Sequence, residues 1–172
     1  AVDIAVQDLI NWLTTQTLEQ PLHRVAPELH KRLMQLGLLL LGVWLAHRLP
    51  SFIPEGLQRG RGWYLYRGMM SAPVRSRFGV AHIARPEYLL VHGDGPAKVA
   101  PYDRVIGLAA GRMSLGVHLV VGSLIGRMTF ADTHDVMKEL GVYAPATRSM
   151  HGIVDGLGII ASDFMETLPS PD

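Results

Sequence analysis

The spacing of apolar residues changes twice along this chain of 172 residues, and each change limits the fold that it can adopt. Up to residue 48, apolar residues recur every three or four positions, as they do on one side of an α-helix. Between Val74 and Arg85 they alternate with other residues, which is the period of a β-strand. From Leu115 onward the helical spacing returns. We therefore expect an α+β protein that is mainly helical, with a small antiparallel β hairpin or sheet in the middle.

Residues 1–48 are expected to form a helical front of two amphipathic helices. The first ends before Pro21, and the second runs from about Pro27 to Arg48. The second helix carries a heptad-like seam, which is typical of a helix that is central to a fold or forms a dimer interface. Its apolar run covers 14 residues, which is too short for a membrane span of about 20. The seam consists of Leu29, Leu33, Leu36, Leu40, Val43 and His47.

Residues 49–62 and 63–101 are expected to form an irregular connector and a basic β element. Pro and Gly residues punctuate the connector, which indicates low regularity. In the β element, the alternating pattern predicts a hairpin that turns near Phe78 and Gly79. A second turn is expected at residues 92–96, before a short strand.

Residues 102–172 are expected to be helical and to contain a helix-turn-helix. Gly141 is expected to end one helix and Pro145 to begin the next, an arrangement of helix, short turn and helix. A recognition helix places its first residues against DNA bases, so the expected base contacts are Thr147, Arg148 and His151. Apolar residues recur at helical spacing in two helices, at Leu115, Leu119, Leu124 and Met128 and at Ala131, Val136 and Leu140. In the last helix, Met150, Ile153 and Leu157 are expected to face inward.

The charged residues are unevenly distributed, although the formal net charge is only +1. Residues 48–127 carry eleven Lys or Arg and four Asp or Glu, whereas residues 128–172 carry two basic and seven acidic residues. Ten of the eleven central cations are arginines, whose planar guanidinium can bind phosphate or guanine through two parallel hydrogen bonds. Such a surface is expected to attract a polyanion. The arginines assigned to DNA phosphate contacts are Arg59, Arg61, Arg67, Arg75, Arg77 and Arg85.

An alternative interpretation is that these arginines neutralise the acidic C-terminal part of the same chain. The protein would then be a non-enzymatic homo-oligomeric assembly module, which forms a homodimer through the heptad-like seam and has no nucleic-acid role. A dimer is compatible with either interpretation, because many helix-turn-helix proteins bind DNA as dimers.

Neither an active site nor a metal site is predicted. Asp132, Asp135 and Glu139 share one side of a helix with Lys138 beside them, which is typical of a solvated surface. Asp103 is expected to brace a turn. The eight His residues show no HExxH spacing, and the absence of Cys excludes disulfides and thiolate metal sites. We therefore predict no catalytic residues, no metal ligands and no cofactor, since an enzyme would require a pocket with convergent polar groups.

The order and spacing of several short segments resemble the region ahead of the catalytic domain in bacterial insertion-sequence transposases of the ISKra type, a family of DDE transposases. They include PLHRVAPELHKRLMQLGLLLLG, VRSRFGVAHIARPEYLL and MTFADTHDVMKELGVYAPATRSMHGIVDGLG. In this chain the similar segments are residues 21–42, 74–90, 100–108, 112–114, 128–158 and 164–171.

The resemblance implies that the chain binds double-stranded DNA at the terminal inverted repeats of the element, in the bacterial cytoplasm and associated with the nucleoid. It also implies that an RNase H-like domain, which uses metal ions, follows this region in a transposase. Residues 1–172 contain no segment that resembles such a domain, so we expect this chain to be no enzyme. Many relatives carry cysteine pairs, as zinc ligands, in the segment corresponding to residues 88–101. This chain has none there, so no zinc is expected.

Overall fold

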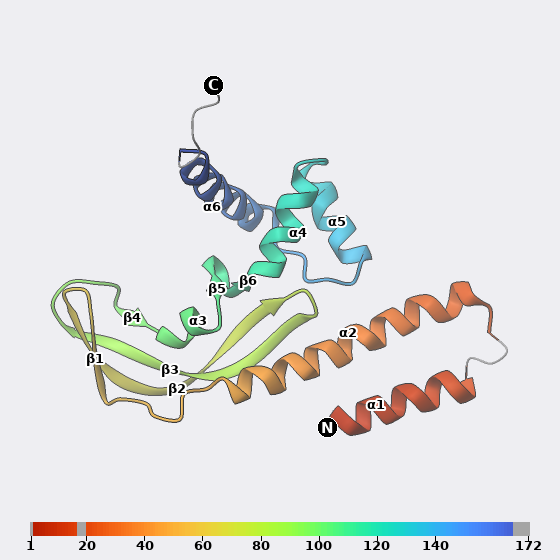
Figure 1. Ribbon diagram of the computed structural model, residues 1–172, viewed down its shortest axis with the longest axis horizontal. Coiled ribbons are helices and arrows are strands. Elements are labelled where there is room, and N and C mark those ends of the chain that lie inside the picture. The colour runs from red at the N-terminus through yellow and green to blue at the C-terminus, as the bar shows by residue number, and fades with distance from the viewer. Residues whose placement is uncertain (1, 17–19, 167–172) are drawn as a thin grey trace.

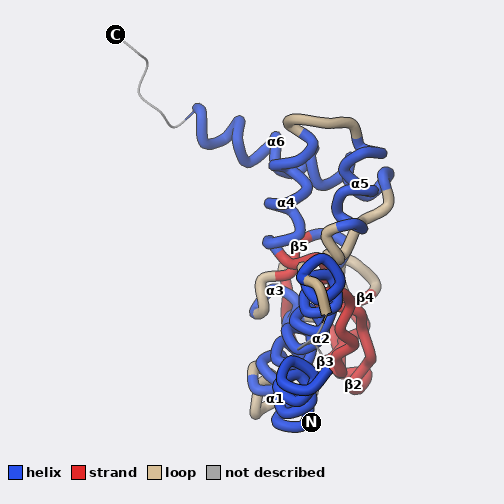
Figure 2. The backbone as a smooth tube through the Cα atoms, turned by 90° about the vertical axis from the view of Figure 1, so that its right-hand side faces the viewer, coloured by secondary structure: helices blue, strands red, loops and turns tan. Residues whose placement is uncertain are grey.

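The chain folds into a pair of N-terminal helices, a β-sheet with one long hairpin, and three C-terminal helices (Figure 1). The structure is a computed structural model and describes residues 2–16 and 20–166. Figure 2 shows α2 alongside the strands, with the C-terminal helices beyond them. The α+β class is as predicted, and the order of helical and strand regions follows the changes in apolar spacing.

The two N-terminal helices are α1 (Val2–Asn11), which continues into the π-helical turn η1 (Trp12–Gln16), and α2 (Leu22–His47). α2 begins earlier than predicted, so Pro27 lies inside the helix. The helix accommodates this proline in its second turn, where the missing N–H removes only one backbone hydrogen bond. Among residues 2–16 and 20–166, no helix has both the length and the apolar composition needed to cross a bilayer.

α2 is held against the rest of the molecule at its C-terminal end and in its middle. The Tyr102 hydroxyl donates a 2.6 Å hydrogen bond to the Leu45 carbonyl, one of the carbonyls at the end of the helix. In the middle of α2, the Phe78 ring packs against Gly37, where an added Cβ would lie 2.5 Å from the ring. A glycine at this position therefore allows the hairpin turn to approach the helix backbone.

Two long strands, β2 (Gly62–Ser76) and β3 (Gly79–His92), form an antiparallel hairpin with its turn at residues 77–78. The turn lies where the alternating pattern predicted it. The prediction of a small hairpin does not describe the structure, because the strands contain 15 and 14 residues and belong to a mixed sheet of six strands. Strand β1 (Gly56–Arg59) pairs with β2 inside the segment that was expected to be an irregular connector. Pro54 and Gly60 flank this strand, so these residues mark its borders rather than the absence of structure.

The short strands extend the sheet on both sides of the hairpin. The strand order across the sheet is β4, β3, β2, β6 and β5. Strand β6 runs parallel to β2, whereas the other paired strands are antiparallel. A small core on one face buries Tyr64, Tyr88 and Val99. The elements between the hairpin and the C-terminal helices are β4 (Lys98–Val99), α3 (Pro101–Val105), β5 (Leu108–Ala109), η2 (Ala110–Arg112) and β6 (Met113–Ser114).

The C-terminal helices α4 (Leu115–Ile125), α5 (Phe130–Glu139) and α6 (Thr147–Glu166) enclose a core of their own. This unit also contacts α2, because the His30 Nε2 lies 2.7 Å from the Leu140 carbonyl oxygen. The core of the unit consists of Met113, Val117, Val121, Met137, Met150 and Ile153.

The predicted inward face of α6 is confirmed, whereas apolar spacing alone does not identify the buried face of α4. Met150 and Ile153 of α6 are buried as predicted, and Leu157 packs against them. In α4 the leucines at helical spacing do not mark the buried face, because Leu115 and Leu119 are 57% and 59% exposed whereas Val117 and Val121 are buried. Apolar residues lie almost all around α4, so the spacing of its leucines does not identify the side that is buried.

The apolar spacing also does not mark the buried face of α5, since Leu140, the residue that follows this helix, is 52% exposed. Its buried face is formed by Thr133 and Met137. The segment between α5 and α6 covers residues 140–146, which is longer than the turn of about three to four residues in a helix-turn-helix. The fold therefore does not establish a helix-turn-helix, which stays a prediction.

Candidate nucleic-acid interface

Five of the six arginines of the predicted basic surface fall into two groups, and those of the first group are held by other residues of the protein itself. Arg67 donates from Nη1 to Glu87 Oε1 at 2.7 Å. Arg75 donates from Nη1 to the Gly111 carbonyl at 2.6 Å, and its guanidinium lies 5.9 Å from the centre of the Tyr143 ring. These contacts make Arg67 and Arg75 part of the packing between strands and loops.

Arg85 is the most strongly enclosed member of the first group. Its side chain is 3% exposed, and its Nε lies 2.9 Å from Asp103 Oδ1. The N–H is not directed at that oxygen, so the contact is an ion pair without a well-aligned hydrogen bond. The expected phosphate contact of Arg85 does not fit this geometry, because a buried guanidinium beside a carboxylate is closed to a phosphate.

Asp103 joins two segments that are distant in the sequence. Besides its contact with Arg85 of β3, its Oδ2 lies 3.9 Å from the Nε of Arg112 in η2. Burial raises the pKa of the Asp103 carboxyl, although the charges of Arg85 and Arg112 act in the opposite direction. Asp103 therefore braces the sheet against η2, a role wider than the local turn that was expected.

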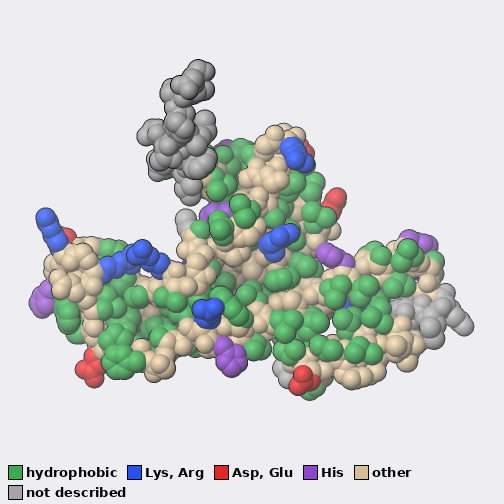
Figure 3. Space-filling model, in the orientation of Figure 1, with side chains coloured by type: hydrophobic (Ala, Val, Ile, Leu, Met, Phe, Trp, Pro, Cys, Tyr) green, Lys and Arg blue, Asp and Glu red, His purple; other side chains and the backbone are tan. Residues whose placement is uncertain are grey.

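The second group of cations lines a cleft between β1, β4 and α3, which we call the basic cleft. Its cations are Arg59, Lys98 and Arg104, and its volume is about 670 Å³. Arg59 and Arg104 are exposed, and neither has a carboxylate within 4.0 Å in the part of the chain that the structure describes. Arg61 is exposed in the adjoining turn between β1 and β2. Figure 3 shows Lys and Arg side chains on this face, from the β1–β4 end of the sheet to the C-terminal helices.

Lys98 is only loosely paired. Its Nζ lies 3.8 Å from Glu87 Oε1, and its side chain is 57% exposed. The hydrogen bond from Arg67 lowers the pKa of Glu87; burial opposes that effect, and the charges of Lys98, Arg67 and Arg85 add to it. Glu87 thus stays a carboxylate whose nearest cation is Arg67, which leaves Lys98 able to contact another anion.

Arg77 stands apart from both groups. It is exposed in the hairpin turn, at the end of β2 opposite to the basic cleft. Its aliphatic part packs near α4, since a Cβ added to Gly116 would lie 3.1 Å from Arg77 Cδ. The six predicted arginines therefore do not form a continuous surface. Arg59 and Arg61 lie at one end of the hairpin, and Arg77 lies at the other.

The acidic C-terminal part does not neutralise the central arginines among the side chains that the structure describes. The ion pairs of residues 48–127 are Arg67–Glu87, Lys98–Glu87, Arg85–Asp103 and Arg112–Asp103, all between residues of that same region. Asp132 instead contacts Thr129 at the start of α5, where the threonine hydroxyl also accepts a 3.2 Å hydrogen bond from the Asp132 N–H. This arrangement leaves the cations of the basic cleft available to a ligand.

The three residues predicted to contact bases are all exposed and lie together in the first turns of α6. Thr147 and Arg148 project from the first turn. The His151 ring stacks on Phe130, with 3.9 Å between ring centres and 30° between ring planes. The structure brings these side chains to one part of the surface, and their contact with DNA stays a prediction.

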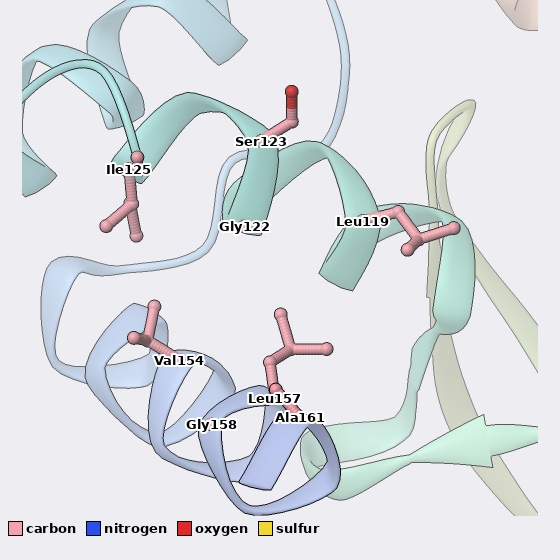
Figure 4. A pocket seen from close by; sticks show the side chains of 9 residues that line it. Leu119, Gly122, Ser123, Ile125, Val154, Leu157, Gly158 and Ala161 are labelled. Carbon is pink, nitrogen blue, oxygen red and sulfur yellow. The ribbon is translucent and has the colours of Figure 1, made fainter. Parts of the chain in front are cut away.

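A second cavity lies between α4 and α6 and has a volume of about 490 Å³. Figure 4 shows Val154 and Leu157 pointing from α6 toward α4, whereas the Ser123 hydroxyl points away from α6. The lining is almost entirely apolar, so this cavity lacks the convergent polar groups of an active site. Within residues 2–16 and 20–166, no group of three or more His, Asp or Glu side chains is placed to hold a metal ion.

Sequence reasoning missed Lys98 and Arg104 as members of the basic surface. Lys98 reaches it because β4 pairs with β3, where Leu89 is opposite Lys98. Arg104 reaches it because α3 follows directly from β4. The two-residue strand and five-residue helix are too short to produce a periodic pattern, so no sequence signal placed these cations beside Arg59.

Comparisons of this chain with protein-family models, with curated proteins and with solved structures give no match.

Proposed function

We propose that this chain binds double-stranded DNA and recognises transposon ends, as the N-terminal, non-catalytic region of an ISKra-type insertion-sequence transposase. The observation that carries the proposal is the basic cleft. Its two arginines have no carboxylate partner among the described residues, and the exposed Lys98 joins them from a neighbouring strand. The family and the recognition of transposon ends rest on the resemblance of the sequence.

The physical reason is that Arg59 and Arg104 line one cleft with Lys98, and neither arginine has a carboxylate within 4.0 Å among the described residues, since Asp103 in the same lining pairs with Arg85 and Arg112. A phosphate backbone supplies anions at regular spacing, and its neutralisation releases condensed counterions, which favours binding strongly at low salt. Arginine can donate two parallel hydrogen bonds to one phosphate, so Arg59 and Arg104 suit this role.

The hairpin also sets the distance over which the chain contacts DNA. Arg61 precedes β2 and Arg77 follows it, and a strand of 15 residues separates positions at its ends by roughly 45 Å. One turn of B-DNA extends about 34 Å. In our proposal, the two ends of the hairpin contact phosphates more than one helical turn apart, which fixes the chain along the duplex.

Sequence recognition is assigned to α6. Phosphate contacts position a protein on DNA, whereas contacts to base edges determine which sequence it prefers. Arg148 can donate two hydrogen bonds to a guanine, and Thr147 and His151 are adjacent on the same exposed surface. The stacking of His151 on Phe130 restricts the orientation of its ring, which favours a specific contact.

The test is to select bound duplexes from a random DNA pool with the purified chain, at low and at physiological salt. We expect one sequence motif to be enriched at both salt concentrations. Binding without enrichment that disappears as salt rises would reduce the basic cleft to a general polyanion surface. Absence of binding at both salt concentrations would overturn the proposal and favour the assembly module.

A further inference from the structure

One side of α2 is apolar along its whole length and is only partly covered within a single chain, where Leu29 and Leu36 are half-buried. At about 100° per residue, its residues lie within an arc of roughly 100° on the helix. Leu33, Leu40, Val43 and Trp44 are 48%, 49%, 45% and 45% exposed. We call this side the outer stripe of α2, and it consists of Leu22, Leu29, Leu33, Leu36, Leu40, Val43, Trp44 and His47.

The sides of α2 that flank the outer stripe have partners within the chain. On one side, Leu45 is 2% exposed and its carbonyl accepts from Tyr102. On the other side, the Arg32 guanidinium lies 4.6 Å from the centre of the Trp12 ring, next to α1. α1 and the sheet thus cover α2 from two directions and leave the outer stripe between them.

None of the charged residues within α2 lies on the outer stripe, although the guanidinium of Arg48, which follows the helix, lies 5.1 Å from the centre of the Trp44 ring. The charged residues of α2 are Arg24, Glu28, Lys31 and Arg32, and all four lie off the stripe. Glu28 pairs with Arg32 at 2.9 Å and contacts Lys31 at 4.0 Å. An apolar partner can therefore cover Leu33, Leu36 and Leu40 without removing an ion of α2 from water, which is the main cost of burying a mixed surface, while Arg48 borders the stripe at Trp44.

The exposed apolar area of the outer stripe comes close to that of a dimer interface. The exposed large side chains of the outer stripe present roughly 400 Å² per chain, or about 800 Å² for two copies, against roughly 1,000 Å² of apolar area in a stable interface of ordinary size. The rest of such an interface is polar rim, which the flanking residues supply. The stripe also repeats at spacings of three and four, so two copies can interdigitate about a twofold axis.

We infer that the outer stripe of α2 is a homodimer interface and that its occupant is the outer stripe of a second copy of this chain. Pairing two α1–α2 helical hairpins in this way gives a four-helix arrangement, the usual solution for amphipathic helix pairs with one uncovered side. The inference does not depend on DNA binding, since no residue of the basic cleft takes part in it.

Leu40 and Leu39 provide a matched pair of positions to test it. They are adjacent in α2 and similarly exposed, at 49% and 43%, but Leu39 lies about 100° away from Leu40 and outside the outer stripe. In sedimentation equilibrium over a wide dilution series, we expect the unmodified chain and Leu39→Glu to be dimers and Leu40→Glu to be a monomer. Circular dichroism checks that both variants keep their helical content.

Three results would overturn the inference: a monomer at every concentration of the unmodified chain, a dimer of Leu40→Glu, or equal dissociation of both variants. Thiol protection gives a second measurement that does not depend on the Glu variants folding, because the chain contains no Cys. The thiol in Leu40→Cys is expected to react with an alkylating reagent more slowly as protein concentration rises. The thiol in Leu39→Cys should react at a constant rate, and constant rates at both positions would contradict a dimer through this stripe.

Discussion

Arg85 in β3 and Arg59 in β1 belong to the same sheet and have opposite surroundings. Arg85 is buried, and its Nε is 2.9 Å from Asp103 Oδ1. Arg59 is exposed at the basic cleft, with no carboxylate in contact among the described residues. The difference shows that the local density of arginine does not define a binding surface. An arginine that the protein's own carboxylates or carbonyls hold stabilises the fold, and an exposed arginine without such a partner is available to an external anion.

The largest effect is expected from removing the carboxylate of Asp103, which pairs with Arg85. Asp103→Asn leaves the charge of Arg85 buried without its carboxylate, so we expect the free energy of unfolding to fall by about 3 kcal/mol. Urea denaturation followed by circular dichroism measures this change. Asp94→Asn, at an exposed turn residue, is the matched control and should change stability little. Equal stability of the two variants would show that Arg85 does not depend on Asp103.

Substitution of the unpaired arginines Arg59 and Arg104 should lower DNA affinity rather than protein stability. We expect the double variant Arg59→Gln, Arg104→Gln to lose roughly tenfold in DNA affinity and to reduce the salt dependence by about two phosphate contacts. Fluorescence anisotropy with a labelled duplex at several salt concentrations measures both quantities. Arg67→Gln removes an arginine already bonded to Glu87 and should leave the salt dependence unchanged. An equal loss in this control would contradict the distinction between paired and unpaired arginines.

The smallest effect on stability is expected from substituting Glu87. This residue contacts both Arg67, one of the arginines held by the protein, and Lys98 of the basic cleft. Since its pKa is lowered in the folded protein, its carboxylate contributes stability that is present above the unfolded pKa of about 4.5 and is lost as pH falls below it. We expect the unmodified chain to exceed Glu87→Gln in stability by less than about 1 kcal/mol at neutral pH. The difference should disappear toward pH 3 in urea titrations. A difference that stays constant with pH would contradict the proposed role of its charge.

The sequence predicted the parts of the fold that depend on local patterns. Alternation around Phe78 located the hairpin turn, because side chains in a strand alternate between its two faces. The inward face of α6 was also correct, since Met150 and Ile153 stand out among polar and small neighbours. α4 lacks this contrast between apolar and polar residues, because apolar residues lie almost all around it. Its buried side depends on where α5 and α6 pack, which its own apolar residues do not specify.

The candidate site was less predictable because it depends on contacts between distant segments. The burial of Arg85 requires Asp103, which reaches it through the chain reversal at β4 and α3. Lys98 and Arg104 enter the basic cleft by the same reversal, whereas Arg77 lies at the other end of the hairpin. A count of arginines along the sequence includes all these residues without distinguishing them, because neither their partners nor their positions are encoded in local spacing.

The contacts of α2 have a consequence for how the chain can change in evolution. The helix contacts α5, the hairpin turn and α3 at His30, Gly37 and Leu45, respectively. Inserting or deleting one residue between these positions would rotate the following contact by about 100° and displace it by about 1.5 Å along the helix axis. Substitutions on the outer stripe leave these contacts in register. The number of residues in α2 is thus fixed by its contacts within the chain, whereas the side chains of its outer stripe are constrained only by the proposed contact with a second copy.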